Sequence, residues 1–298
     1  MPLKTALHHI EEAAAYGVSD VNLSGGETLC YPDLEELIRA CSSYGLASAV
    51  ALSGALADEA TLQGLIEAGV SQIYISLNGS TEEINERTRD GYEEAVRTLG
   101  LLRSLREKGI FPAKTGINWV MHRTNAEDFP SMIRLAEEYR VEQLVVMGLK
   151  PDASGHLYGF PSGEQMTAVA RKIRSYAGPL EIGVESCFSP LRALIGQTLF
   201  AGNLNRGIAR GCGAGRDSFS VDVTGAYTPC RHILLPEKYP SLDAYWNDSA
   251  VLQLLRSAED HRRPPCRGCR LEAYCLPCME IGEKLGGSLL AGFPGCPL

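Results

Sequence analysis

Apolar positions follow a repeating order along the first half of the chain. A stretch with helical spacing is followed by a short continuous apolar run, and each ends at glycine or small polar residues. Strands with continuous apolar runs are buried on both faces, which is typical of a parallel sheet covered by helices. The spacing predicts helices near 3–14, 33–41, 58–68, 81–87, 92–108 and 126–139, and strands near 18–23, 47–52, 72–77, 113–121 and 143–149.

This alternation predicts an α/β fold. Right-handed crossovers would curl the five strands into a barrel or part of one, and five are too few to close a (β/α)8 barrel. Ligands bind at the carboxyl ends of the strands in such sheets. We therefore expect a ligand-binding rim where small and polar residues follow the strands, at 24–27, 53–54, 76–79, 122–125 and Lys150.

The pattern changes after Lys150. A loop at 151–155 precedes a predicted helix at 162–176, a strand at 180–185, a helix near 190–201 and a glycine-rich stretch at 202–215. Short apolar runs on either side of Thr224-Gly225 predict a β-hairpin over 218–229. We expect a partial barrel at 1–155, linking helices and a strand at 156–205, and a small cysteine-rich domain at 206–298.

Composition narrows the class of protein. Among the 298 residues, 45% are hydrophobic and 21% are charged, as in an ordinary soluble globular protein. The formal net charge of −8 argues against a nucleic-acid partner, because phosphate binding needs a basic surface. No apolar run is long enough to span a membrane, so no membrane partner is expected.

Cysteines gather in the last third of the chain, where seven of the ten lie. Residues 266–278 read C-x2-C-x5-C-x2-C. Such thiolates bind soft metals or iron–sulfur clusters. Without a visible secretory signal, reduced cysteines at this density indicate the cytoplasm and argue against disulfides. Zinc stays an alternative, although its paired knuckles are usually further apart.

The stretch Ser24-Gly25-Gly26-Glu27 ends a predicted strand and is followed by Tyr31-Pro32-Asp33 and a helix. Two glycines let the backbone approach a ligand, and a carboxylate pairs with an ammonium group. This stretch resembles the radical S-adenosylmethionine (SAM) superfamily, whose Gly-Gly-Glu turn binds the methionyl amine of the cofactor. The resemblance implies a partial (β/α)6-type parallel barrel that lacks its first strand in this chain.

Further positions carry the same resemblance. Ser76-Leu77-Asn78-Gly79 is similar to the family's Ser-Leu-Asp-Gly, Ser53-Gly54 stands in place of Asn-Gly, and Arg89 lies where the family has an arginine that contacts the cofactor. No catalytic residue is assigned. The cofactor-binding residues that the resemblance implies are Gly25, Gly26, Glu27, Ser53, Ser76, Asn78 and Arg89.

The C-terminal third resembles the SPASM extension of that superfamily, which carries two auxiliary 4Fe-4S clusters. Twelve residues separate Cys212 from Gly225, and four separate Gly225 from Cys230, as in the family pattern. The resemblance leaves one iron without a cysteine. That iron is either open or ligated by Cys187, by an oxygen or nitrogen ligand, or by substrate. Cys30 and Cys41 are expected in the core. One cluster would be held by Cys266, Cys269, Cys275 and Cys296, and the other by Cys212, Cys230 and Cys278.

One family motif is missing from the 298 residues. Radical SAM enzymes hold their SAM-cleaving cluster with C-x3-C-x2-C, and this chain has no cysteine before Cys30. The chain is either an N-terminally incomplete form or a natural degenerate one that keeps the auxiliary clusters. We favour incompleteness, because loss of the first strand would expose a sheet edge.

The resemblance implies radical chemistry, in which a deoxyadenosyl radical abstracts hydrogen from a substrate and the auxiliary clusters relay electrons or bind substrate. Maturation of a ribosomal peptide or protein is the preferred function. The alternatives are biosynthesis of a tetrapyrrole or redox cofactor, and a non-catalytic, cluster-bearing scaffold or electron-transfer partner. Expected partners are a peptide or small-molecule substrate and a reductant such as a flavodoxin or ferredoxin.

Overall fold

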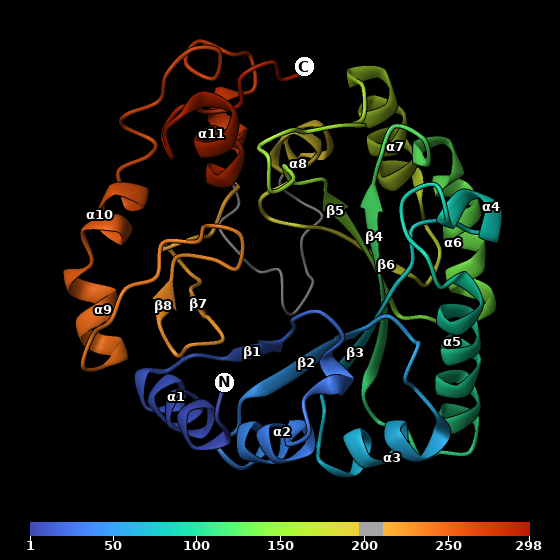
Figure 1. Ribbon diagram of the computed structural model, residues 1–298. Helices are drawn as coiled ribbons and strands as arrows, with labels where there is room; N and C mark the ends of the chain where they lie inside the picture. The colour runs from blue at the N-terminus through green and yellow to red at the C-terminus, as the bar shows by residue number, and fades with distance from the viewer. Residues whose placement is uncertain (197–210) are drawn as a thin grey trace.

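The computed structural model describes residues 1–196 and 211–298. Six parallel strands form one sheet in the order β1-β2-β3-β4-β5-β6, and it curves from β1 at one edge to β6 at the other (Figure 1). The α/β prediction is confirmed. The strands are β1 (Asp20–Leu23), β2 (Ala47–Leu52), β3 (Gln72–Ser76), β4 (Lys114–Met121), β5 (Gln143–Gly148) and β6 (Glu181–Val184).

The sixth strand has a different place from the one predicted. The sequence predicted a strand at 180–185 but placed it in a segment that links the two domains. In the structure this strand, β6, belongs to the main sheet and pairs in parallel with β5, with Leu144 opposite Ile182. The sheet therefore continues past the first five strands. The predicted boundary at 205, the end of the helix expected near 190–201 and the start of the glycine-rich stretch lie outside the described residues.

Helices cover the outer face of the sheet. Ile73, Trp119 and Leu144 point toward them and are completely buried, whereas Tyr74 belongs to a separate apolar cluster with Ala49 on the alternate strand positions. The helical elements are α1 (Leu3–Tyr16), η1 (Thr28–Cys30), α2 (Leu34–Ser43), α3 (Glu59–Glu67), α4 (Glu82–Asn85), α5 (Tyr92–Glu107), η2 (Ala126–Asp128), α6 (Phe129–Glu138), α7 (Gly163–Ser175) and α8 (Ser189–Ile195).

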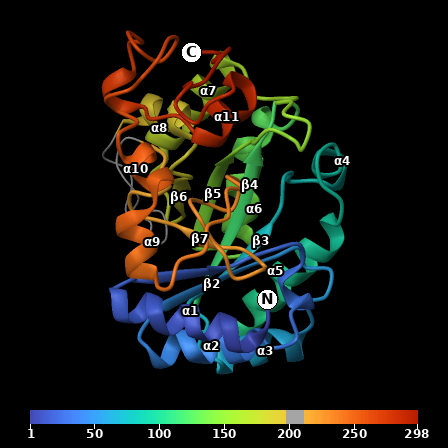
Figure 2. The same ribbon diagram turned by 60° about the vertical axis from the view of Figure 1, so that its left-hand side comes forward.

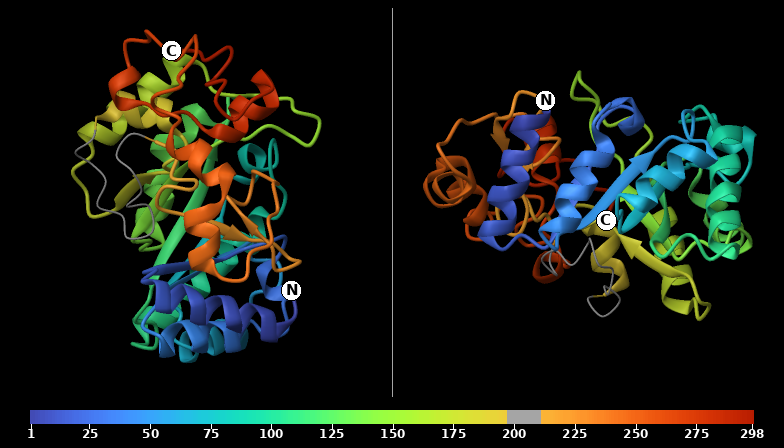
Figure 3. Two further views of the ribbon diagram at one scale, coloured as in Figure 1. Left: turned by 90° about the vertical axis from the view of Figure 1, so that its left-hand side faces the viewer. Right: turned by 90° about the horizontal axis from the view of Figure 1, so that it is seen from below.

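The C-terminal region, residues 211–298, contains the predicted hairpin. It lies alongside the sheet and reaches α1 near the β1 edge and α8 near the β6 edge (Figures 2 and 3). Its elements are β7 (Ser220–Val221), antiparallel β8 (Tyr227–Thr228), α9 (Leu242–Asp248), α10 (Ala250–Arg256), η4 (Glu272–Tyr274) and α11 (Met279–Gly286).

Hydrogen bonds hold this region against the barrel at both ends. On α1, Glu12 accepts hydrogen bonds from the Tyr227 hydroxyl at 2.7 Å and from the Leu242 amide at 3.2 Å. Near the other edge, the Ser189 hydroxyl lies 3.2 Å from Cys275 Sγ. The C-terminal region therefore packs against α1 near one edge of the sheet and against α8 near the other.

No helix within residues 1–196 or 211–298 is both long and apolar enough to cross a lipid bilayer.

Gly54, which follows β2, has a backbone conformation that residues with a side chain rarely adopt. Its φ is +98°, and a Cβ there would lie 2.7 Å from the Glu94 carbonyl oxygen. Left-handed strain and overpacking together should make Gly54→Ala about 3 kcal/mol less stable. Chemical denaturation would measure this. The control is Gly183→Ala, because no heavy atom lies within 4 Å of its Cβ position. A midpoint for Gly54→Ala equal to that of the control would contradict the prediction.

Candidate functional site

The Gly-Gly-Glu turn follows β1 and is joined to the end of β2. Glu27 Oε2 accepts hydrogen bonds from the Ser53 amide, at 3.0 Å, and from the Ser53 hydroxyl. The Thr28 hydroxyl donates to the Ala51 carbonyl oxygen at 2.8 Å, which holds η1 against β2. The Glu27 carboxylate is thus fixed in place by two strand ends that are far apart in the sequence.

The two glycines of the turn are exposed and leave space above the backbone. No heavy atom lies within 4 Å of the position that a Cβ would take at Gly25 or Gly26. A ligand could therefore approach the main chain here as closely as glycine permits. This open backbone beside a fixed carboxylate fits the amino-acid end of a SAM molecule.

Arg89 lies close enough to Glu27 for their two charges to interact. Burial lowers the pKa of the Arg89 guanidinium, and the negative charge of Glu27 opposes that effect. The structure thus brings Arg89 within electrostatic reach of Glu27, although sixty-two positions separate the two residues in the sequence.

Asn78 has a different environment from the rest of the predicted set. It is buried; its Oδ1 accepts from the Val120 amide at 3.0 Å, and its Nδ2 donates to the Thr88 hydroxyl at 3.1 Å. Its carbonyl oxygen accepts from Trp119 Nε1 at 3.1 Å. Asn78 thus ties the end of β3 to β4.

Ser76, the last residue of β3, has a polar neighbour that was not predicted from the sequence. The parallel register places Ser76 directly opposite Asn118 on β4, so both side chains lie on the same face of the sheet. Asn118 interrupts the apolar run at 113–121, and that polar interruption was the available signal.

A first set of four thiols, here called the distal thiol group, consists of Cys266, Cys269, Cys275 and Cys296. Burial raises the pKa of Cys275 to about 12, and the charges of the other three members add to that shift. Cys266 Sγ accepts a hydrogen bond from the Phe293 amide at 3.3 Å. Four thiols within electrostatic reach of one another, with amide donors to sulfur, suit the ligands of an iron–sulfur cluster.

A second set, the proximal thiol group, consists of Cys212, Cys230 and Cys278. The Cys212 amide donates to the Leu276 carbonyl oxygen at 3.1 Å, which places Cys212 beside the chain that leads to Cys278. Cys230 Sγ accepts from the amides of His232 and Ile233, both at 3.4 Å. Burial raises the pKa of Cys212 to about 12, so this thiol stays protonated without metal.

None of the ten cysteines forms a disulfide. Across the described ranges 1–196 and 211–298, no three histidine, cysteine or acidic side chains are arranged to hold a single metal ion. In a cluster each thiolate binds its own iron, so the sulfurs need not meet at one point. Cys41 is buried as expected, whereas Cys30 is exposed, so its assignment to the core was wrong. Cys30 ends the short η1 turn and points outward.

A largely buried ion pair lies just after the ends of β5 and β6. Lys150 Nζ is 2.8 Å from Glu185 Oε2 and donates to the Gly148 carbonyl oxygen at 2.9 Å. Burial alone would raise the pKa of Glu185, but the Lys150 charge and hydrogen bond lower it to about 2. Nearby, burial and the charges of Arg231 and Lys150 lower the pKa of His232 to about 4, so this imidazole is neutral.

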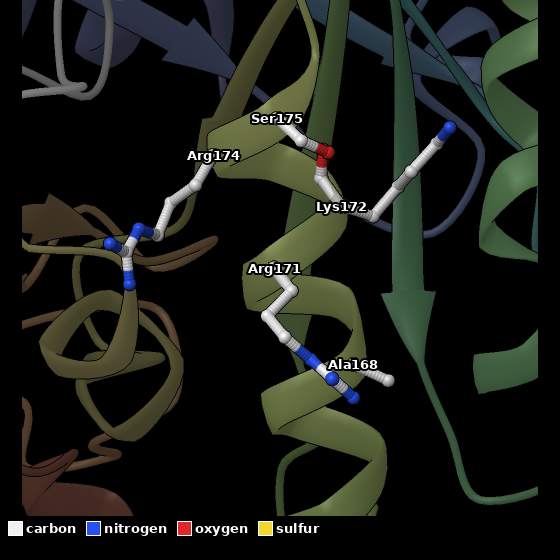
Figure 4. Close-up of a pocket in the computed structure, with 5 residues that line it drawn as sticks. All are labelled: Ala168, Arg171, Lys172, Arg174 and Ser175. Atoms are coloured by element: carbon white, nitrogen blue, oxygen red, sulfur yellow. The ribbon is translucent and has the colours of Figure 1, made fainter.

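A surface hollow on α7 lies apart from these groups. It is lined by Ala168, Arg171, Lys172, Arg174 and Ser175, and none of these belongs to the rim or to a thiol group. The Lys172 and Arg174 side chains extend to opposite sides of the helix (Figure 4). The basic groups therefore do not converge on a common ligand.

Taken together, the fold and these sites define a parallel β/α protein with a glycine-lined rim and a thiol-rich C-terminal region. Residues 1–136 match the family model described as the radical SAM superfamily, so the chain carries a radical SAM domain. This confirms the resemblance seen in the sequence.

Two curated relatives match nearly the whole chain. A "PqqA peptide cyclase" of Gluconobacter oxydans is 27% identical over 306 residues, which cover 97% of this chain and 80% of the relative. An "AdoMet-dependent heme synthase" of Methanosarcina barkeri is 25% identical over 303 residues, which cover 98% and 86%.

Solved structures share the fold. SuiB of Streptococcus suis, bound to S-adenosylmethionine, superposes with a TM-score of 0.74 at 19% identity and covers 100% of this chain and 71% of its own. SuiB bound to its precursor peptide SuiA gives a TM-score of 0.69, also at 19% identity, covering 94% and 65%. The likeness extends over the C-terminal region as well as the sheet.

Proposed function

We propose that this protein is a radical SAM enzyme that acts in the maturation of a ribosomally made peptide. The observation that carries the proposal is the rim, where a Glu27 carboxylate held by Ser53 follows two open glycines, with the Arg89 guanidinium within electrostatic reach of Glu27. The names of the relatives support the choice of a peptide, since one is called a peptide cyclase and SuiB was solved with a precursor peptide.

At the rim, each group has a separate task in binding SAM. Glu27 accepts the hydrogen bonds of the methionyl ammonium, while Ser53 keeps the carboxylate from rotating away. Arg89 offers paired donors to the carboxylate of the cofactor. The glycine backbone lets the amino-acid end lie against the main chain. The SAM-cleaving 4Fe-4S cluster of this family would supply the electron for cleavage; the three cysteines that hold it there have no counterpart among the 298 residues, so the rim residues would bind only the cofactor.

We further propose that the two thiol groups hold two auxiliary 4Fe-4S clusters. The distal group offers four cysteines, and the proximal group offers three. These clusters would relay electrons supplied by a reductant such as a flavodoxin or ferredoxin. Ten free thiols support a place in the cytoplasm, where such side chains stay reduced.

Two other functions each rest on one observation. The heme synthase relative favours biosynthesis of a tetrapyrrole cofactor. The seven cysteines of the C-terminal region would also serve a scaffold that binds clusters and passes electrons without cleaving SAM. Formation of 5′-deoxyadenosine by the reduced, reconstituted protein would demonstrate SAM cleavage, which a scaffold cannot carry out.

Replacing Glu27 by glutamine should weaken SAM binding about 10- to 100-fold, because a charge-assisted hydrogen bond is worth about 1.5–3 kcal/mol. Equilibrium dialysis with labelled SAM would measure the dissociation constant. The matched control is Glu36→Gln, an exposed residue of α2 that gives the same change in net charge. Equal affinity of Glu27→Gln and wild type, with both proteins folded, would remove Glu27 from the site.

A further inference from the structure

Cys187 lies just after β6, between the partly buried Glu185 and α8. It is partly buried and packs against two separate apolar clusters. One cluster is the core of the sheet and includes Cys278, and the other is the core of the C-terminal region and includes Cys212. Cys187 therefore occupies the seam between the barrel and the thiol-rich region.

The thiol of Cys187 lies among the proximal thiol group. It shares a hydrogen bond with the Cys278 thiol and donates one to the Glu185 carboxylate. Cys212 and Cys230 both lie within electrostatic reach of Cys187. Cys187 thus lies near all three members of the proximal thiol group, which come from separate segments of the chain.

We propose that Cys187 is the fourth thiolate ligand of the auxiliary cluster held by Cys212, Cys230 and Cys278. This inference rests on the proposed auxiliary clusters. Its consequence is functional: with four cysteine ligands, each iron is occupied, and no iron is left open to bind substrate. The proximal cluster would then relay electrons, and the cluster would also join β6 to the C-terminal region.

Ligation exchanges a proton for iron. A bond forms between Cys187 Sγ and iron, the S–H bond breaks, and the proton leaves to solvent. Without iron, the hydrogen bond with Cys278, burial and the Glu185 charge raise the pKa of Cys187, so the thiol keeps its proton; the Lys150 ammonium, paired with Glu185 at 2.8 Å, opposes this effect.

Glu280 is the main rival for the same iron. It is buried in the first turn of α11, its Oε2 has no hydrogen-bond partner in the described part of the chain, and its charge acts on Cys230. Cys187 is preferred because its sulfur directly contacts Cys278 and because thiolate is the softer ligand.

The experiment compares reconstituted variants of the 298-residue chain under anaerobic conditions. Wild type should hold about eight irons, four per cluster. After mild oxidation, Cys187→Ala should lose about one iron and show the EPR signal of a three-iron cluster. Cys187→Ser should keep the iron through its hydroxyl but shift the spectrum. The controls Glu280→Gln and Cys41→Ala should keep the iron content and EPR spectrum of wild type.

Several outcomes would overturn the proposal. Cys187→Ala could keep full iron with no three-iron signal, or Glu280→Gln could give that signal instead. If circular dichroism shows that Cys187→Ala does not fold, the serine variant decides, and a spectrum identical to wild type refutes ligation. Wild type that takes up no iron overturns the auxiliary clusters themselves, whereas wild type with two clusters and an unchanged Cys187→Ala overturns only this inference.

Discussion

Cys275→Ala is expected to lose one whole cluster, about four of about eight irons, and to destabilise the C-terminal region. Cys275 lies within electrostatic reach of the three other thiols of the distal group, and its sulfur contacts Ser189 of α8. Binding of a structural metal can be worth about 10–16 kcal/mol, as much as the whole stability of a domain. Loss of one ligand therefore removes folding free energy that the small region cannot replace.

Iron and sulfide analysis after anaerobic reconstitution would measure the first effect, and thermal unfolding would measure the second. The matched control is Cys30→Ala, which removes an exposed thiol far from the distal group in the sequence. The control should keep full iron and an unchanged melting temperature. Stoichiometric zinc with no iron in the wild-type protein would disprove the assignment of clusters altogether.

Lys150→Met is expected to cost about 3–5 kcal/mol in the free energy of unfolding, because it leaves the Glu185 carboxylate buried without its partner. The side chains of this pair are only 12% and 15% exposed, and Glu185 Oε2 also accepts from the Gly148 amide at 3.1 Å. Methionine replaces the volume of the lysine but not its charge. The main penalty is therefore the desolvation of the unpaired Glu185 carboxylate.

Denaturant unfolding of single and double variants would test this pair. The double variant Lys150→Met with Glu185→Leu should recover much of the lost stability, because it removes both buried charges. Lys108→Met is the control, since Lys108 lies at a similar distance of 2.7 Å from Glu59 but both side chains are about half exposed. It should cost no more than about 1 kcal/mol. Equal losses at the two positions would contradict a burial penalty.

Much of the fold could be predicted from the sequence because local patterns report it directly. Continuous apolar runs such as 72–77 become strands whose alternate residues face the helices, and the hairpin around Thr224-Gly225 forms where turn residues interrupt apolar ones. The role of the strand at 180–185 could not be read in this way. Its pattern identifies a strand, but its partner β5 is chosen by packing.

The rim shows the same limit. The Gly-Gly-Glu turn is a local signal, and the sequence alone was enough to mark it. That Asn78 is held by Thr88 and Val120 depends on contacts between separate segments, as does the position of Asn118 opposite Ser76. Cys30 was misplaced for a related reason, because one apolar-looking position in a short turn does not fix the direction of its side chain.

The sequence by itself determined which candidate groups this protein carries: seven cysteines at the spacing of a metal-binding region and a carboxylate after two glycines. Those properties depend on residue type and spacing, which are local. Only the tertiary structure decided which thiols meet, because Cys187 and Cys278 are ninety-one positions apart and come together through packing of β6 against the C-terminal region. Tertiary packing likewise placed a buried lysine–glutamate pair beside them, since a low-dielectric site forms only when distant segments exclude water together.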